Sequence, residues 1–93
     1  MTDCPRYTIA YDSAFDRILK KLKRRDPALL TALDLGIEKI LKEPMLGKPL
    51  KNVLRNSRRL HIEGSFVLLY EIYECQVRLL DFDHHDRIYR KYS

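Results

Sequence analysis

Alternating apolar and polar residues predict four β-strands in this chain. The first strand covers residues 6–11, where Tyr7, Ile9 and Tyr11 share one face. The other three strands follow one another late in the chain, at residues 58–62, 66–73 and 76–82. The short connections between these three segments suit antiparallel hairpins.

Between the first and second strands, apolar residues recur with the period of an α-helix. We expect Ser13 to cap a first helix, Asp26-Pro27 to begin a second one, and Glu43-Pro44 to end it. The apolar stripes of the two helices consist of Phe15, Ile18, Leu19 and Leu22 in the first, and Leu29, Leu30, Leu33, Ile37, Ile40 and Leu41 in the second. Together these residues predict a helical hairpin.

The predicted order of elements is therefore βααβββ. This is an α+β fold in which an antiparallel sheet is covered on one face by the two-helix hairpin. A chain of 93 residues has the size of one domain, spanning residues 1–93, and can bury one compact core. The content of 45% hydrophobic and 33% charged residues excludes a disordered or collagen-like chain.

The sequence contains no segment typical of a membrane span or a secretion signal. The longest uninterrupted apolar run, residues 66–70, is far shorter than the roughly 20 residues that cross a bilayer. Residues 1–10 lack the apolar stretch of a signal peptide, so we expect a cytoplasmic protein without a membrane partner. Cys4 and Cys75 form no CxxC pair, and we expect unlinked thiols rather than a disulfide or a zinc site.

The net charge of +5 is unevenly distributed along the chain. Residues 44–62 contain no acidic side chain and carry five cationic ones, which are Lys48, Lys51, Arg55, Arg58 and Arg59. Clustered cations attract polyanions by releasing counterions, so nucleic acid is the first partner to consider. Residues 20–25 form a second basic run. The solvated face of a helix explains this run at least as well as binding of nucleic acid does.

The histidines indicate what chemistry this basic surface could perform. Strand alternation should place Arg59 and His61 on the face of the sheet that the helices leave open. His84 and His85 follow the last strand and should come near the same face. Cleavage of RNA without a metal needs a base, an acid and a cation that stabilises the phosphorane, and these residue types supply all three.

Two other interpretations of the histidines stay open on the residues alone. Residues 81–86 include several metal-ligand types, but they lack HxH or HExxH spacing, and neighbouring side chains tend to diverge. We therefore expect neither a metal nor a cofactor. The histidines are also compatible with ordinary surface positions that carry no chemistry.

The second half of the chain resembles the RelE/ParE toxin superfamily, and most specifically its YafQ-like branch. That branch reads His-Pro-Leu where this chain has Lys48-Pro49-Leu50, and Arg-x-x-His-Ile at residues 58–62. An Asp-Trp pair and Leu-Leu-Ile-Tyr-x-Ile correspond to residues 65–72, and a closing Gly-Ser/Thr-His-x-x-Leu/Val-Phe/Tyr motif corresponds to residues 83–89. The correspondence needs no gap over residues 58–70, and the βααβββ layout extends the resemblance over nearly the whole chain.

The resemblance implies an endoribonuclease that cuts mRNA in the ribosomal A site and is held inactive by a cognate antitoxin in a heteromeric complex. It places His61 and His85 on catalytic histidines of the family. From the residues themselves, we assign Arg59 as the stabiliser of the phosphorane. The expected products carry a 2′,3′-cyclic phosphate. The residues expected to bind RNA are Lys48, Lys51, Arg55, Arg58 and Tyr89, the last of which falls on a family aromatic position.

Two positions depart from the family pattern. Lys48 stands where the family has histidine, and Ser65 stands where it has aspartate. Lysine still binds a phosphate, whereas serine cannot replace a carboxylate as a base or as the residue that orients a histidine. These departures predict reduced activity, and they leave two alternatives open, an inactive binding module of the same fold and a ParE-like inhibitor of DNA gyrase.

Overall fold

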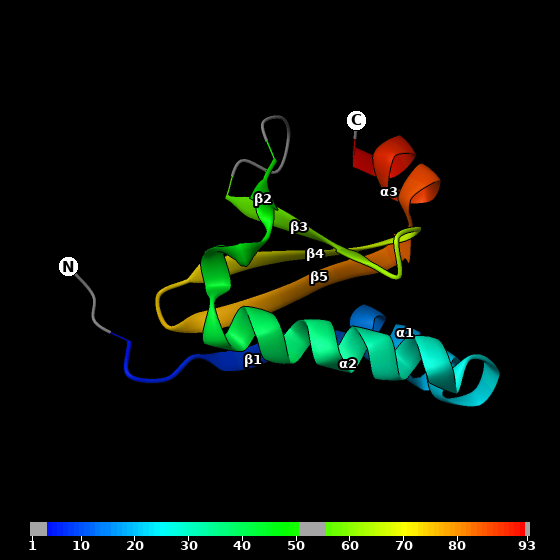
Figure 1. Ribbon diagram of the computed structural model, residues 1–93, viewed down its shortest axis with the longest axis horizontal. Helices are drawn as coiled ribbons and strands as arrows, with labels where there is room; N and C mark the ends of the chain where they lie inside the picture. The colour runs from blue at the N-terminus through cyan, green and yellow to red at the C-terminus, as the bar shows by residue number, and fades with distance from the viewer. Residues whose placement is uncertain (1–3, 51–55, 93) are drawn as a thin grey trace.

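The computed structural model describes residues 4–50 and 56–92. Its elements are β1 (Thr8–Tyr11), α1 (Ser13–Arg25), α2 (Pro27–Lys42), the 3₁₀ turn η1 (Pro44–Leu46), β2 (Lys48–Pro49), β3 (Ser57–Ile62), β4 (Phe66–Tyr73), β5 (Gln76–His84) and α3 (His85–Tyr92). The predicted α+β fold is confirmed, with the α1–α2 hairpin on one side of the sheet (Figure 1). The short strand β2 and the C-terminal helix α3 add to the predicted order.

The five strands form one sheet in the order β1-β5-β4-β3-β2. Strands β2 to β5 pair antiparallel, as the hairpin connections predict, whereas β1 pairs parallel with β5. The parallel pair is compatible with the rest of the chain because the two helices and three strands separate β1 from β5, so no tight turn has to join them. The first strand therefore occupies the sheet edge beside the last one.

A β-bulge in β5 changes which side chains face the helices. Leu69 of β4 pairs with Asp81 and Tyr70 pairs with Leu79, so Leu80 has no partner across the strands. The extra residue keeps Leu79 and Phe82 in the core beneath the helices and turns Asp81 toward the other face. The sequence pattern alone gives no sign of this shift.

Aspartate side chains cap both long helices. The Asp12 carboxylate accepts a hydrogen bond from the Phe15 N–H at 2.9 Å, so the N-cap of α1 lies one residue before the expected Ser13, which is the first helical residue. Asp26 caps α2 in the same way through the Leu29 N–H, with Pro27 at the first helical position as expected.

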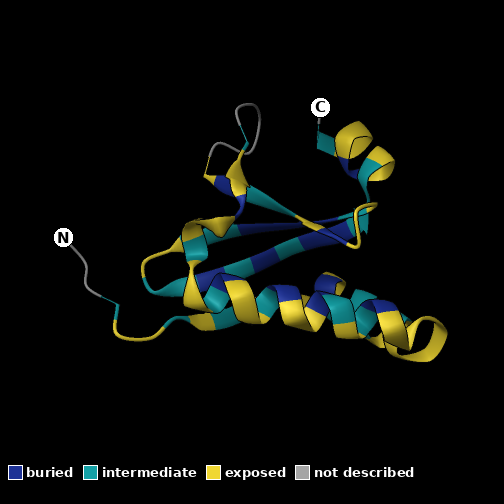
Figure 2. Cartoon of the chain, viewed as in Figure 1, coloured by how far each residue is buried: buried dark blue, intermediate teal, exposed yellow. Residues whose placement is uncertain are grey.

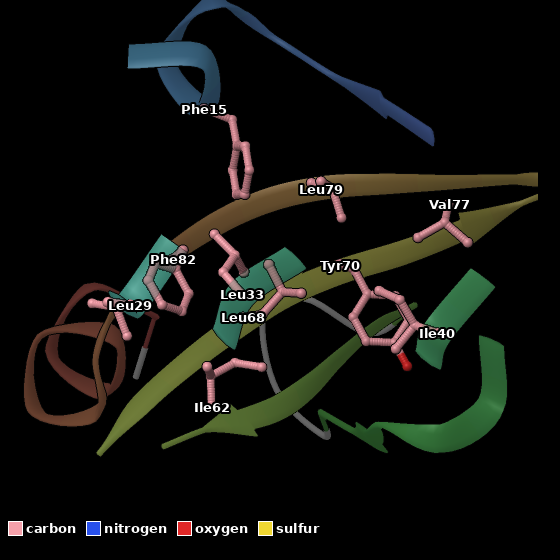
Figure 3. Packing of buried hydrophobic residues seen from close by; sticks show 10 residues of the cluster. All are labelled: Phe15, Leu29, Leu33, Ile40, Ile62, Leu68, Tyr70, Val77, Leu79 and Phe82. Carbon is pink, nitrogen blue, oxygen red and sulfur yellow. The ribbon is translucent and has the colours of Figure 1, made fainter. Parts of the chain in front are cut away.

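The main core lies between the α1–α2 hairpin and the sheet, where the buried stripes of both helices face the strands (Figure 2). Figure 3 shows its members, which are Phe15, Leu29, Leu33, Ile40, Ile62, Leu68, Tyr70, Val77, Leu79 and Phe82. A smaller cluster on the opposite face joins Val67 and Leu69 of β4 to Ile88 of α3. The face expected to be open is thus partly covered by α3.

The buried Tyr70 ties the segment before β2 to the sheet. Its hydroxyl donates to the Pro44 carbonyl at 2.7 Å and accepts from the Gly47 N–H at 2.8 Å. A Cβ at position 47 would lie 2.6 Å from this hydroxyl and 2.8 Å from the Arg59 carbonyl oxygen, so only glycine fits here. The contact fixes the start of β2, and with it the position of Lys48.

The expectation of unlinked thiols was wrong, because Cys4 and Cys75 form a disulfide with a Cα–Cα distance of 5.5 Å. The β1–β5 register pairs Thr8 with Gln76, and the Thr8 N–H bonds the Cys75 carbonyl at 3.1 Å. This parallel pairing brings the segment before β1 to the β4–β5 turn. Because the two cysteines are 71 residues apart, the sequence gives no sign of this contact.

Among the residues that the structure describes, no helix combines the length and the apolar character that crossing a membrane requires.

Candidate functional site

Helix α3 carries one side of the candidate site because of its helical period. His85, Ile88, Tyr89 and Tyr92 are spaced three and four residues apart and so share the face that packs on the sheet. Buried Ile88 fixes this face against Val67 and Leu69. As a result, His85 and Tyr89 lie at the border between α3 and the strands.

Strand β3 carries the other side of the site through Arg59. Its guanidinium Nη1 donates to the Tyr89 hydroxyl at 3.3 Å, and its Cζ lies 5.8 Å from the centre of the Tyr89 ring. The Arg59 Nε is buried and has no hydrogen-bond partner among the residues that the structure describes. A buried donor without a partner is costly, and the positive charge of this guanidinium suits an anionic ligand.

Tyr89 connects Arg59 to His85. The centres of the Tyr89 and His85 rings are 6.3 Å apart. The His85 Nδ1 lies 2.9 Å from Oδ1 of Asp86, and the His84 ring packs beside His85 with 4.3 Å between ring centres. We refer to Arg59, Tyr89, His85 and Asp86 as the Arg59–His85 cluster.

Asp86 is a functional candidate that the sequence pattern does not indicate. Ser65, at the position of the family aspartate, also adjoins His85, because the His85 N–H donates to the Ser65 carbonyl at 2.8 Å. A carboxylate is thus present beside this histidine, although it comes from the next residue along α3. A prediction of α3 would have identified Asp86 as an acid in the first turn of a helix.

His61 lies on the same face of β3 as Arg59, as strand alternation predicts, and opposite Val67 in the β3–β4 register. Its side chain is exposed. Within residues 4–50 and 56–92, it makes no hydrogen bond, ion pair or ring contact. The structure therefore brings Arg59, Tyr89 and His85 into contact, while His61 stands apart on the same strand.

The predicted RNA-binding residues separate into three groups. Lys48 pairs with Arg59 across β2 and β3 and so shares its face of the sheet. Arg58 faces the other way, and its guanidinium donates to the carbonyls of Gly47 at 2.6 Å and Met45 at 3.3 Å. We therefore expect Arg58 to act in holding the η1 turn rather than in binding RNA. Lys51 and Arg55 lie outside the described residues.

A network of charges anchors α3 to β5. The buried Asp81 carboxylate accepts from the Tyr92 hydroxyl at 2.8 Å and from the Lys91 ammonium at 3.1 Å. Asp83 accepts from Lys91 at 3.3 Å and from Arg87 at 3.5 Å. We call these five residues the α3 anchor, because they connect the helix that carries His85 to the strand before it.

The α3 anchor shifts several pKa values. Partial burial alone would raise the pKa of Asp83, but hydrogen bonds from the His84 N–H and Lys91, with the charges of Lys91 and Arg87, hold it below its ordinary value. Burial alone would lower the pKa of Lys91, but Asp81 and Asp83 raise it. Burial and the Asp81 carboxylate both raise the pKa of Tyr92. The ionised forms of Asp83 and Lys91 are thus favoured at neutral pH.

The fold is one that solved structures of RelE-like toxins share. The toxin–antitoxin complex RelBE2 from Mycobacterium tuberculosis contains a chain that is 30% identical, with a TM-score of 0.70 and coverage of 85% of this chain and 98% of that one. YafQ from Escherichia coli is 16% identical, with a TM-score of 0.72 over 96% of this chain and 99% of its own, and shares the fold.

A family model described as the ParE toxin of type II toxin–antitoxin systems matches residues 7–89. A Methanocaldococcus jannaschii protein named "Putative toxin RelE4" is 40% identical over 87 residues, which are 91% of this chain and 93% of the relative. The chain belongs to the ParE toxin family of the RelE/ParE superfamily. The resemblance that the sequence motifs indicate is thereby confirmed.

Proposed function

We propose that this toxin is a metal-free endoribonuclease that cleaves mRNA on the ribosome. The observation that carries the proposal is the Arg59–His85 cluster, in which a histidine lies between a carboxylate and an arginine-bound tyrosine. These groups match the demands of RNA cleavage, which are proton transfer and stabilisation of a pentacovalent phosphorane. The basic character of the chain, with a net charge of +5, supports a polyanionic substrate.

In the proposed reaction, the 2′-oxygen attacks the adjacent phosphorus and the bond from phosphorus to the 5′-oxygen breaks. The proton of the 2′-hydroxyl passes to a base, and an acid supplies a proton to the departing 5′-oxygen. The products are a 2′,3′-cyclic phosphate and a free 5′-hydroxyl. His85 and His61 are the two residues proposed for proton transfer.

Asp86 determines which nitrogen of His85 is available for this chemistry. The Asp86 carboxylate, 2.9 Å from Nδ1, favours a proton on that nitrogen and so leaves Nε2 free to face the RNA. The carboxylate also stabilises the imidazolium form. In this scheme, Asp86 supplies the orienting group that Ser65 cannot provide.

The cations have a separate part in the proposed mechanism. Arg59 stabilises the phosphorane with its guanidinium, and Tyr89 holds this group in place through the contact at 3.3 Å. Lys48 lies on the same face through the β2–β3 register and binds a flanking phosphate. Tyr89 is half-exposed and also offers a ring on which a base can stack.

We further propose a cognate antitoxin as the physiological partner. The solved RelBE2 structure is a complex of a toxin with its antitoxin, and this chain shares its fold and 30% of its residues. A positively charged toxin suits an acidic segment that wraps around it. Because ribosomes and mRNA are cytoplasmic, the proposed activity places the protein in the cytoplasm.

Inhibition of DNA gyrase is the second candidate function, because the matching family model carries the ParE name. A gyrase inhibitor that acts by binding needs no oriented histidine, so the His85–Asp86 contact favours cleavage of RNA. An inactive binding module predicts the same fold without a functional reason for that contact. An assay that measures both RNA cleavage and inhibition of DNA gyrase separates the nuclease from its two rivals.

The test is induction of the toxin alone, followed by single-turnover cleavage of mRNA on purified ribosomes. We expect growth arrest, shortened transcripts, and a loss of about 10²- to 10⁴-fold in cleavage for His85→Ala with unchanged RNA binding. His84→Ala is the matched control and should be nearly silent. EDTA should not inhibit. Intact transcripts with inhibited gyrase supercoiling would replace the proposal with its rival, and a dominant effect of His84→Ala would overturn the assignment of His85.

A further inference from the structure

The junction between β5 and α3 brings three metal-ligand side chains together. His84 ends the strand, and His85 and Asp86 begin the helix. One ligand atom from each of them lies within 4.8 Å of the others. The expectation that adjacent side chains diverge does not hold here, because the backbone changes from extended to helical between the two histidines.

The spacing of these atoms is near that of a metal site. The Asp86 carboxylate oxygens lie 2.9 Å from the His85 Nδ1 and 3.8 Å from the His84 Nδ1. Bonds of about 2.0–2.1 Å to a tetrahedral ion separate the ligands by roughly 3.3 Å. Small rotations close the remaining gap, since the three side chains are 39%, 38% and 66% exposed.

The lone pairs also suit a metal. The His84 Nδ1 accepts a hydrogen bond from the Asp86 N–H at 3.3 Å, and a nitrogen that accepts carries the lone pair that a metal requires. This bond is long, so replacing it costs little. Arg87 and Lys91 are paired with Asp83, and Arg90 donates from Nε to the Asp86 backbone carbonyl at 3.4 Å, so none of the three is paired with the Asp86 carboxylate.

Two imidazoles and one carboxylate select the class of metal. This donor set suits Zn²⁺ and neighbouring transition metals, whereas Mg²⁺ and Ca²⁺ prefer oxygen ligands. Three protein ligands leave a coordination position for water, as in the His₂-carboxylate sites of zinc enzymes. The exposed position of the junction lets an ion enter from solvent.

We propose that His84, His85 and Asp86 form a Zn²⁺ site that switches off the toxin. The regulatory part rests on the proposed nuclease function, whereas the binding part does not. Zn²⁺ on the His85 Nδ1 keeps the ring proton on Nε2, so Nε2 can no longer accept a proton from the RNA or cycle through imidazolium. The ion also withdraws the Asp86 carboxylate from its role beside His85.

A direct measurement of Zn²⁺ binding tests the metal site independently of the proposed nuclease function. Untagged protein, kept without thiol reductant so that Cys4 and Cys75 stay linked, is titrated with Zn²⁺ by calorimetry and with Co²⁺ by visible absorption. We expect one ion per chain, and at least about tenfold weaker binding in His84→Ala and in Asp86→Asn. His61→Ala removes the remaining histidine of the chain and is the matched control, which should bind as the wild type does.

Equal binding by wild type and His84→Ala, or no binding at about 100 μM Zn²⁺, would overturn the site. In the cleavage assay, Zn²⁺ should inhibit the wild type but leave His84→Ala active, because His84 has no part in the proposed chemistry. Stimulation by Zn²⁺, or equal inhibition of both proteins, would overturn the regulatory role. A protein that binds Zn²⁺ through these residues but cleaves no RNA would keep the site and refute the nuclease.

Discussion

The Nδ1 atom of His85 lies 2.9 Å from Oδ1 of Asp86, the residue that follows it in the chain. The helical start of α3 makes this contact, and the backbone bond from His85 to the Ser65 carbonyl holds the same residue from the strand side. His85 is thus held on two sides, and the centre of its ring lies 6.3 Å from that of Tyr89, whose hydroxyl accepts a hydrogen bond from Arg59.

If Asp86 orients His85, Asp86→Asn should lower the rate of single-turnover cleavage by roughly tenfold or more, since the amide holds the ring less firmly and does not stabilise imidazolium. The affinity for RNA should not change. Asp34→Asn, on the exposed side of α2, is the control for a lost negative charge. A rise in KM with an unchanged kcat would show that Asp86 acts in binding instead.

The effect of replacing each cation on RNA binding should depend on the face of the sheet on which its side chain lies. Lys48→Ala should weaken RNA binding by about the same factor for all sequences and reduce the salt slope by about one. Lys51→Ala and Arg55→Ala should do the same on account of their charge. Arg58→Ala should leave the slope unchanged and lower stability, since its guanidinium holds the η1 turn. Filter binding at several salt concentrations measures the slopes, and a slope change in Arg58→Ala equal to that in Lys48→Ala would refute the division of faces.

The α3 anchor should weaken at both extremes of pH. The pKa of Asp83 is lowered on folding, so its contribution is present above its ordinary value of 3.8 and is lost as the pH falls through the folded value. The pKa of Lys91 is raised on folding, so its contribution is present below 10.5 and is lost as the pH rises beyond that value. Urea denaturation across this range should show both losses in the wild type.

Lys91→Met should flatten both limbs of that stability profile, because Lys91 is the partner that Asp81 and Asp83 share. Lys20→Ala, which breaks only an exposed pair with Asp16 on α1, is the control and should leave the profile unchanged. Identical profiles for the wild type and Lys91→Met would mean that the network does not couple the pH to folding.

Tyr70→Phe should destabilise the domain by about 2 kcal/mol, because it leaves the Gly47 N–H and the Pro44 carbonyl without their buried partner. Tyr73→Phe is the control, since the exposed Tyr73 contacts Arg78 through its ring. Denaturant titrations measure both variants. Equal stability of the two proteins would show that the hydroxyl of Tyr70 does not hold the turn.

Alternation and helical period were enough to predict the sheet, the helical hairpin and the face on which Arg59 and His61 lie. They could not predict α3, because its eight residues include few apolar ones and the Asp81–Lys91 and Asp81–Tyr92 contacts stabilise it from outside the helix. Without α3 in view, the contact of Asp86 with His85 could not be foreseen. The pairing of β1 with β5, which joins Cys4 to Cys75, likewise depends on tertiary structure alone.

The extra residue in β5, Leu80, changes which alternate positions of the strand face the helices. Before Leu80, odd-numbered positions such as Val77 and Leu79 face the hairpin of helices, and after it even-numbered Phe82 does so. If the same residues ran as a regular strand without the bulge, Asp81 would face the apolar core and the following helix would be directed toward the side already filled by α1 and α2. The bulge therefore keeps the surface that makes the protein fold apart from the surface that carries His85, and removal of Leu80 alone would give a regular strand with the same two faces.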